Sequence, residues 1–100
     1  MQKIITLCGS TRFENLFRLV AKEESFKGNI ILSPDVYAHA EQLLLSREQI
    51  TLLKRLHRKK IDMCNEILVI NPGGYIGEST CDEIKYARHV GKIVRFYEKN

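Results

Sequence analysis

The sequence alternates short apolar runs with longer segments of helical periodicity, and this order limits the folds that the chain can adopt. The apolar runs are each typical of a strand, and the first two of a buried strand: Lys3–Cys8 (KIITLC), Asn29–Ser33 (NIILS), Glu66–Ile70 (EILVI) and Lys92–Tyr97 (KIVRFY). Strands that alternate with helices form βαβ units with parallel strands. We therefore predict an α/β fold, a small Rossmann-like or flavodoxin-like sandwich in which a mostly parallel sheet of four or five strands carries helices on both faces.

The segments between the apolar runs carry the helix signals. Apolar residues recur at helical spacing between residues 13 and 20. A second helix is expected after a capping box at residues 46–49, and a third from about residue 78 to residue 90. Residues 35–45 contain helix formers but no clear cap, so we expect a loop with a short helix that covers a site.

Length and charge narrow the class of protein. A chain of 100 residues fits one domain, over residues 1–100, with one hydrophobic core. Its apolar runs are far shorter than the roughly 20 residues that cross a bilayer, and the N-terminus does not resemble a signal peptide. We expect a cytoplasmic protein without a membrane partner.

Much of the net charge of +4 comes from the basic cluster Lys54–Lys60 (KRLHRKK). Such a cluster can contact the phosphate backbone of a nucleic acid. We interpret it as a solvated helix face instead, because no aromatic residues interleave to stack on bases.

The three cysteines, Cys8, Cys64 and Cys81, are odd in number, lie far apart and form no CxxC pair. This spacing favours reduced thiols over disulfides or a zinc site, and we interpret all three as packing residues. We accordingly expect no metal and no cofactor.

Two polar loops should lie where such folds bind ligands, outside the carboxyl ends of the strands. The first, CGSTRF, follows the first strand. Gly9 lets the backbone approach a ligand, and Ser10 and Thr11 place hydroxyls at a helix start whose free amides attract phosphate. Arg12 can add a bidentate contact to the same anion. Plain capping by Ser10 or Thr11, with Arg12 in solvent, explains the loop equally well.

The second loop, NPGGYIGEST, leads from the third strand into the last helix. Gly73, Gly74 and Gly77 give this loop conformational freedom. Ser79 and Thr80 follow at positions where hydroxyls cap a helix or contact a ligand. The loop therefore combines flexibility with the donors that a bound ligand needs.

Glu83 is the acid of the expected last helix whose position is not explained by the dipole at the start of the helix. Glu78 and Asp82 are explained by their favourable interaction with the helix dipole in its first turn. Glu83 shares a face with Thr80 and Ala87, one turn to either side, and the small Ala87 leaves room beside the carboxylate. A carboxylate at the edge of a buried face needs a partner or a purpose. Spacing alone leaves a structural and a functional role open.

CGSTRF after the first strand, the strand EILVINP and the segment GESTCDEIKYARHVGK together resemble the nucleoside 2-deoxyribosyltransferase superfamily, including its 2′-deoxynucleoside 5′-phosphate N-hydrolase branch. That family has a GS-x-R segment after its first strand and a (G/S)T-x-x-E-x-x-x-A-x-x-x-GK-like segment before its last strand. The resemblance spans nearly the whole chain, and the order and placement of the motifs carry it.

This resemblance implies cleavage or transfer at the N-glycosidic bond of a (deoxy)nucleoside 5′-monophosphate or nucleoside. Glu83 takes the place of the family's nucleophile, which attacks the anomeric carbon, expels the base and leaves a glycosyl-enzyme intermediate for water or another base. The loop after the first strand matches the segment that holds the sugar or 5′-phosphate. Together with the loop residues described above, the candidate substrate-binding residues are Gly9, Ser10, Thr11, Arg12, Gly74, Gly77, Ser79 and Thr80.

The sequence departs from the family on the helix before the third strand, where the family usually carries an aspartate. The matching turn is RLHR, which places His57 there, and the nearest acid is Asp62. A histidine can donate a proton to a departing base, but packing on an apolar helix face is the alternative role. The candidate catalytic residues are thus Glu83, His57 and Asp62.

The chain lacks C-terminal elements that in many family members help to complete a neighbouring subunit's site. We nevertheless expect a homo-oligomer, because shared sites are common in the family and a small open sheet has edges to cover.

The segment PGGYIGESTCDE also resembles the PGG-x-G-T-x-x-E loop of the lysine-decarboxylase-like phosphoribohydrolases, which cleave nucleoside 5′-monophosphates. The alternative function is a nucleotide-binding or sensing module that kept the fold without the chemistry.

Overall fold

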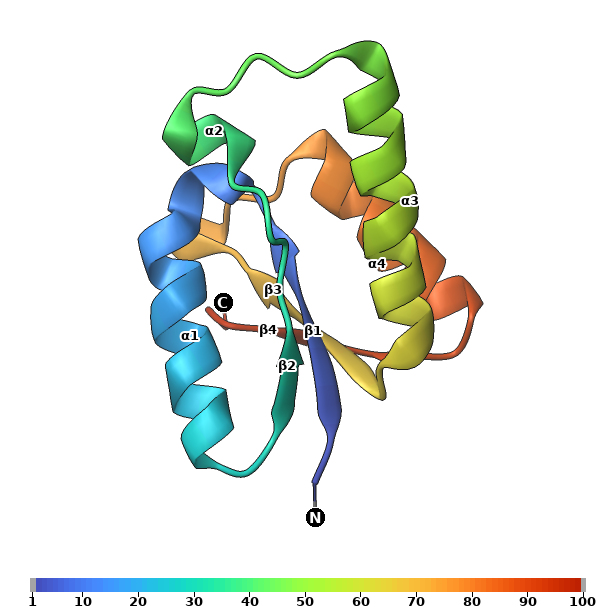
Figure 1. The fold of residues 1–100 in the computed structure, drawn as a ribbon. Helices are drawn as coiled ribbons and strands as arrows, with labels where there is room; N and C mark the ends of the chain where they lie inside the picture. The colour runs from blue at the N-terminus through green and yellow to red at the C-terminus, as the bar shows by residue number, and fades with distance from the viewer. Residues whose placement is uncertain (1, 100) are drawn as a thin grey trace.

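A computed structural model describes residues 2–99, and its sheet has the predicted architecture. Four strands form an all-parallel sheet in the order β2-β1-β3-β4 (Figure 1). The strands are β1 (Ile4–Gly9), β2 (Ile30–Leu32), β3 (Glu66–Ile70) and β4 (Ile93–Phe96). The helices are α1 (Glu14–Phe26), α2 (Ala38–Glu41), α3 (Arg47–Met63) and α4 (Glu78–His89), with 3₁₀ turns at Thr11–Phe13 and Pro72–Gly74.

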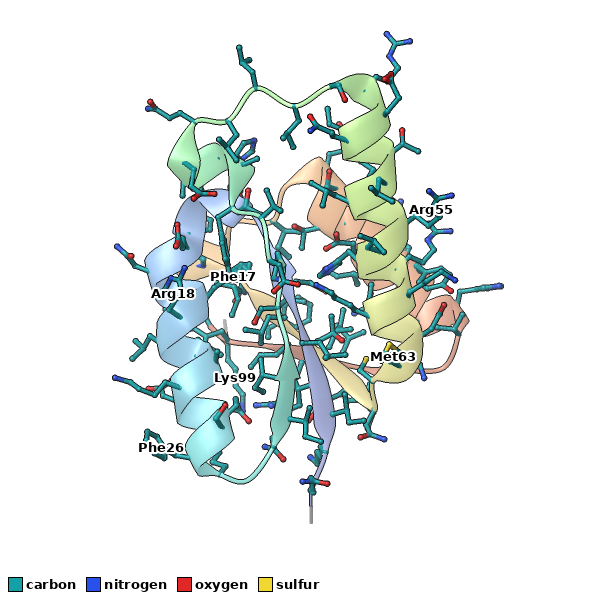
Figure 2. The ribbon with its side chains drawn as sticks, in the orientation of Figure 1. Phe17, Arg18, Phe26, Arg55, Met63 and Lys99 are labelled. Carbon is teal, nitrogen blue, oxygen red and sulfur yellow. The ribbon has the colours of Figure 1, made fainter. Side chains whose placement is uncertain are left out.

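The strand pleat divides the core into two layers, one on each face of the sheet. On the first face α1 covers the sheet, and its Phe17 is fully buried, whereas Arg18 and Phe26 lie on the outer side of the helix (Figure 2). On the second face α3 and α4 lie side by side (Figure 1), contributing Ile61 and Ala87 to the buried layer. The α/β sandwich with helices on both faces, predicted from the sequence, is confirmed.

Local sequence signals account for most element boundaries. Ser46 and Gln49 form the predicted capping box, in which the Gln49 amide donates to Ser46 Oγ over 3.1 Å and the Ser46 amide donates to Gln49 Oε1 over 2.8 Å. The short helix expected within residues 35–45 is α2. Among residues 2–99 there is no helix of the length and apolarity that spanning a membrane would require.

The prediction that Asn29–Ser33 forms a buried strand is wrong in one respect. β2 is the edge of the sheet, and Ile30 remains 44% exposed. An edge strand has a neighbour on only one side, so an apolar run there is not buried on both faces. The apolar composition of this segment does not distinguish an edge strand from a central strand.

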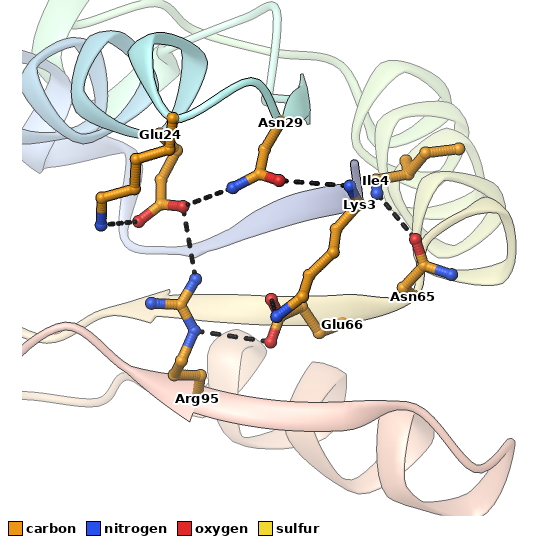
Figure 3. A network of polar contacts seen from close by, with 8 residues as sticks. Lys3, Ile4, Glu24, Asn29, Asn65, Glu66 and Arg95 are labelled. Atoms are coloured by element: carbon orange, nitrogen blue, oxygen red, sulfur yellow. Dashed lines mark hydrogen bonds and ion pairs between the residues drawn. The ribbon is translucent and has the colours of Figure 1, made fainter. Parts of the chain in front are cut away.

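A network of charges ties α1 to β3 and β4 near the amino end of the sheet (Figure 3). Arg95 NH2 lies 3.5 Å from Glu24 Oε1, and Arg95 Nε lies 3.4 Å from Glu66 Oε2. Burial by itself raises the pKa of Glu24, but hydrogen bonds from Lys27 and Asn29, with the charge of Arg95, outweigh burial and hold that pKa below its usual value. The folded protein therefore stabilises an ionised, buried Glu24.

Replacing this carboxylate should weaken the fold in a pH-dependent way. The ionised Glu24 stabilises the protein above about pH 4.5, and this contribution is lost as the pH falls through the lowered pKa. We expect Glu24→Gln to lower the free energy of unfolding near pH 7 by about 1 to 3 kcal/mol, and by less near pH 3, as measured by urea denaturation. Glu23→Gln, at the exposed neighbour on α1, is the control and should change stability by less than about 0.5 kcal/mol. A Glu24→Gln protein as stable as the wild type near pH 7 would contradict this account.

Candidate functional site

The site lies at the point where the order of strands reverses, between the carboxyl ends of β1 and β3. From β1 the chain first adds β2 on one side and later adds β3 on the other, so the loops after β1 and β3 leave in different directions. Gly9 pairs with Ile70 at this point, with φ at +152°. A Cβ on Gly9 would lie 2.8 Å from the Ile70 carbonyl oxygen, so only glycine allows this close approach.

Side chains from β1, α3 and α4 converge beside this point. Cys8 Sγ lies 3.4 Å from His57 Nε2, and His57 Nε2 lies 3.8 Å from Glu83 Oε1. The sulfur, one ring nitrogen and one carboxylate oxygen all lie within 4.8 Å of one another. The pleat explains the placement of Cys8, because alternate residues of β1 face α3 and α4. The helical period brings Glu83 onto the buried side of α4 with Thr80 and Ala87, as predicted from spacing.

Burial sets the protonation of all three groups. It raises the pKa of Glu83 to about 7, and the Asp82 charge adds to this, while the Cys8 thiol and the Lys54 charge act in the opposite direction. Burial and the charge of Lys60 lower the pKa of His57 to about 4. Burial also raises the pKa of Cys8, and the Glu83 charge adds to the rise. At neutral pH the thiol and imidazole are uncharged, and Glu83 is divided between its two forms.

Glu83 Oε1 is buried and has no well-formed hydrogen bond from residues 2–99. A buried carboxylate oxygen without a partner is unfavourable, and the thiol of Cys8 is only a weak donor. Such an atom is a sign of a site that is completed by something other than these side chains.

The cluster is not a relay of the kind found in cysteine hydrolases. In a relay, the thiol contacts one imidazole nitrogen and the carboxylate orients the ring through the other. Here Cys8 and Glu83 both contact Nε2 of His57. The three groups converge on a common point, so nucleophilic catalysis by Cys8 through His57 does not fit.

Two cavities meet at Glu83. The first, of about 300 Å³, lies beside the loop after β1 and is lined by Gly9, Thr11, Lys54, His57 and Glu83, with apolar side chains around them. The second, of about 330 Å³, lies between α3 and α4. Lys54 and Glu83 line both cavities. The carboxylate is therefore accessible to ligands from two sides although one of its oxygens is buried.

The loop after β1 is held by its own polar contacts. Ser10 Oγ accepts hydrogen bonds from Arg12 N over 3.4 Å and from Arg12 Nε over 3.0 Å. The His39 amide of α2 donates to Thr11 Oγ1 over 3.3 Å, and His39 Nδ1 lies 3.3 Å from Ser10 Oγ. The guanidinium of Arg12 lies 5.2 Å from the centroid of the Tyr75 ring. Ser10 does cap the turn, and Arg12 is exposed while its guanidinium group contacts Ser10 and Tyr75.

Two of the three predicted catalytic residues come together, and the third does not. His57 and Glu83 are neighbours across α3 and α4. Asp62 accepts a hydrogen bond from the Tyr86 hydroxyl and does not line either cavity at Glu83. Its partner Tyr86 is a half-buried residue of α4 that lines the second cavity, so Asp62 is connected to that cavity only through the tyrosine.

The predicted residues of the second loop are spread over several places. Ser79 lines the cavity between α3 and α4, and Thr80 is buried beneath it on α4. Gly77 precedes α4 as its N-cap residue. Gly74 lines a separate cavity of about 530 Å³ beside β4. Of the second loop, Ser79 and Thr80 are the residues closest in place to Glu83, and Gly74 belongs elsewhere.

Sequence reasoning missed Cys8 and Lys60 as parts of the site. Cys8 was assigned to packing, although its position one residue before Gly9 places it at the carboxyl end of β1. Lys60 Nζ donates to the Ser33 carbonyl over 2.6 Å and to Asp35 Oδ2 over 3.0 Å, which fixes the wall of the first cavity. The basic cluster is therefore only partly a solvated face.

Comparison with protein-family models gives no match, and no curated protein matches the sequence significantly.

Ionisation of Glu83 should destabilise the fold. With a pKa raised from 4.5 to about 7, the carboxyl group stabilises the folded state only while it is protonated, and this contribution is lost as the pH rises from 4.5 through 7. We expect Glu83→Gln to gain up to about 3 kcal/mol relative to the wild type across that range, measured by urea denaturation with EDTA present. The lowered pKa of His57 makes the fold more stable as the pH rises, and because both proteins contain His57, this contribution cancels in the difference between them.

The matched control is Glu78→Gln, which removes an exposed carboxylate from the same helix. It should change the free energy of unfolding by less than about 0.5 kcal/mol at each pH. A constant difference between Glu83→Gln and the wild type over the whole range would show that burial does not perturb this group.

Proposed function

We propose that this protein cleaves, or transfers a glycosyl group at, the N-glycosidic bond of a nucleoside 5′-monophosphate, with Glu83 as the nucleophile. The observation that carries the proposal is the Glu83 carboxylate, which lies at the switch point of the sheet and borders two cavities. One of its oxygens is buried and has no hydrogen bond from the described residues 2–99. The motif resemblance to nucleoside 2-deoxyribosyltransferases supports the same residue.

The proposed reaction has two steps. In the first, a Glu83 carboxylate oxygen forms a bond to the anomeric carbon while the bond to the base breaks, and the base leaves with the electron pair. In the second, water attacks the same carbon and breaks the ester bond to Glu83. The proton of the water ends on the departed base, and the carboxylate is restored. A second base in place of water gives transfer instead of hydrolysis.

The first cavity suits a nucleotide in its distribution of polar and apolar groups. Gly9 and Thr11 line its wall. Ser10 and Arg12 do not line it, but they are the chain neighbours of Thr11 and carry a hydroxyl and a cation, the groups that a 5′-phosphate would need. Val36 among the apolar side chains of the wall suits the face of a base. The cavity lies at the small end of the range for ligand sites, in keeping with a single mononucleotide.

His57 fits a positioning role better than an acid role. Proton donation to a leaving base needs the imidazolium, and with a pKa of about 4 His57 is neutral at physiological pH. Its Nε2 lies 3.8 Å from Glu83 Oε1, close enough to restrict that side chain. His57 therefore does not protonate the departing base, and expulsion of the base depends on attack by the Glu83 carboxylate.

Removing the carboxylate should abolish turnover. We expect the wild type to release free base from at least one deoxynucleoside or ribonucleoside 5′-monophosphate, detected by chromatography of a substrate panel. Glu83→Gln keeps the shape of the side chain but removes the nucleophile, so we expect the rate to fall by at least about 1000-fold. Glu78→Gln on the same helix should retain the wild-type rate, and circular dichroism should show that both variants are folded.

Other outcomes of this experiment separate the alternatives. Base release unchanged in Glu83→Gln removes Glu83 from the mechanism. Thermal stabilisation by a nucleotide with no base released over long incubation supports the non-catalytic binding or sensing module. The predicted homo-oligomer stays a prediction, which size-exclusion chromatography with light scattering tests directly.

Arg12 should contribute to binding of the phosphate. A charge-assisted contact to phosphate is worth about 1.5 to 3 kcal/mol, so we expect Arg12→Ala to raise KM for a nucleoside 5′-monophosphate by roughly 10- to 100-fold. The corresponding nucleoside, which lacks the phosphate, should show little change. Arg18→Ala, at an exposed arginine on α1 paired with Glu14, is the control. An equal effect of Arg12→Ala on nucleotide and nucleoside would place the phosphate elsewhere.

A further inference from the structure

Cys8, His57 and Glu83 bring a sulfur, a nitrogen and an oxygen together from three separate elements of the fold. We propose that these side chains form a site for Zn²⁺, with three protein ligands and one open position. The inference goes beyond the proposed glycosidic chemistry and does not depend on it.

The distances in the cluster are close to those around a tetrahedral ion. Zinc bonds of about 2.0 Å to nitrogen or oxygen and 2.3 Å to sulfur separate a nitrogen from an oxygen by about 3.3 Å, and a sulfur from either by about 3.5 Å. The distance from Cys8 Sγ to His57 Nε2 is 3.4 Å, which matches one edge of the tetrahedron. The distance from His57 Nε2 to Glu83 Oε1 is 3.8 Å, and all three atoms lie within 4.8 Å of one another, so a small rotation of the Glu83 side chain closes the other two edges.

The convergence of donors on one point also favours an ion. Both the thiol and the carboxylate contact Nε2, and this shared contact rules out a relay while leaving a common point for a metal. Glu83 Oε1 is buried without a well-formed hydrogen bond from residues 2–99. A bound cation would give this oxygen the partner that the side chains around it do not supply.

The donor set selects zinc over the hard cations. Thiolate and imidazole are ligands for Zn²⁺, whereas Mg²⁺ and Ca²⁺ require oxygen ligands. Binding releases the Cys8 thiol proton to solvent, so that the thiolate and the Glu83 carboxylate neutralise the two charges of the ion. A neutral cluster suits a position where Cys8 is fully buried.

The charged side chains near the cluster are themselves balanced and do not oppose binding of a cation. Lys60 is paired with Asp35 at 3.0 Å, and its ammonium group also donates to the Ser33 carbonyl. Lys54 and Asp82 flank Glu83 with opposite effects on its carboxylate. The first cavity reaches Glu83 and His57 and gives the ion an entry path and its fourth position, which water can occupy.

Zinc and substrate would compete for the same carboxylate. Coordination to Zn²⁺ withdraws electron density from the Glu83 carboxylate and fixes its position, so it becomes a poorer nucleophile toward an anomeric carbon. One equivalent of Zn²⁺ should therefore inhibit base release where such activity exists, and EDTA should restore it. The binding test below does not require activity, so it can fail or succeed independently of the proposed function.

Cobalt provides a spectroscopic test on the reduced, full-length protein under anaerobic conditions. Titration with Co²⁺ should saturate at one equivalent and produce a thiolate-to-cobalt charge-transfer band in the near ultraviolet, with intense visible bands of a four-coordinate ion. One equivalent of Zn²⁺ should remove both signals, and excess Mg²⁺ should not. Cys8→Ser should abolish the charge-transfer band, whereas Cys81→Ser, at an exposed cysteine outside the cluster, should keep it.

Two further variants keep the test decisive if Cys8→Ser does not fold. His57→Gln and Glu83→Gln replace partly exposed ligands and should each weaken Co²⁺ binding by at least about tenfold while circular dichroism remains that of the wild type. The proposal is overturned if folded wild type gives no charge-transfer band. It is equally overturned if the band survives Cys8→Ser, disappears in Cys81→Ser, or is unaffected by both His57→Gln and Glu83→Gln.

Discussion

The parallel pairing of β1 with β3 is the constraint on which the rest of the structure depends. These central strands are buried on both faces, and their register places Gly9 beside Ile70 at the carboxyl end. The approach is so close that a side chain at Gly9 would meet backbone. Because the chain turns to one side after β1 and to the other after β3, this end of the pair is also where the sheet leaves space for a ligand.

The same pairing decides the chemistry of the candidate site through burial. Cys8 is held in the interior by β1, so any group that contacts it from α3 or α4 is drawn out of water. Desolvation is the largest influence on the pKa of Cys8, His57 and Glu83 alike, and in each case it favours the uncharged form. The proposed metal ion and the proposed glycosyl transfer both require the ionised form of Glu83, so each would act against this bias.

At the opposite end of the sheet, two other buried carboxylates, those of Glu24 and Glu66, are paired with cations. Glu24 and Glu66 are both more deeply buried than Glu83, and Arg95 reaches both of them (Figure 3). Glu66 Oε1, like Glu83 Oε1, has no hydrogen bond from residues 2–99, but the ammonium group of Lys3 lies 3.4 Å from it. Hydrogen bonds keep Glu24 ionised, whereas burial pushes Glu83 toward neutrality. The two acids at this end of the sheet therefore have cationic partners, whereas the residue nearest to Glu83 Oε1 is the uncharged His57.

The fold class, the element order, the capping box at Ser46 and the orientation of Glu83 on its helix were predictable from the sequence, because they depend on local periodicity and on rules for parallel strands. The exposure of β2 was not, because apolar composition does not distinguish an edge strand from a central one. Cys8, His57 and Glu83 are far apart in the chain, and no spacing rule joins residues from a strand and two separate helices. Only tertiary packing brought their atoms within 4.8 Å and withdrew them from solvent, and it paired Asp62 with Tyr86 instead of placing it in either cavity at Glu83. The sequence by itself determined the scaffold and the residue at its centre, and the tertiary structure decided that residue's partners, because burial and convergence are properties of the packed molecule.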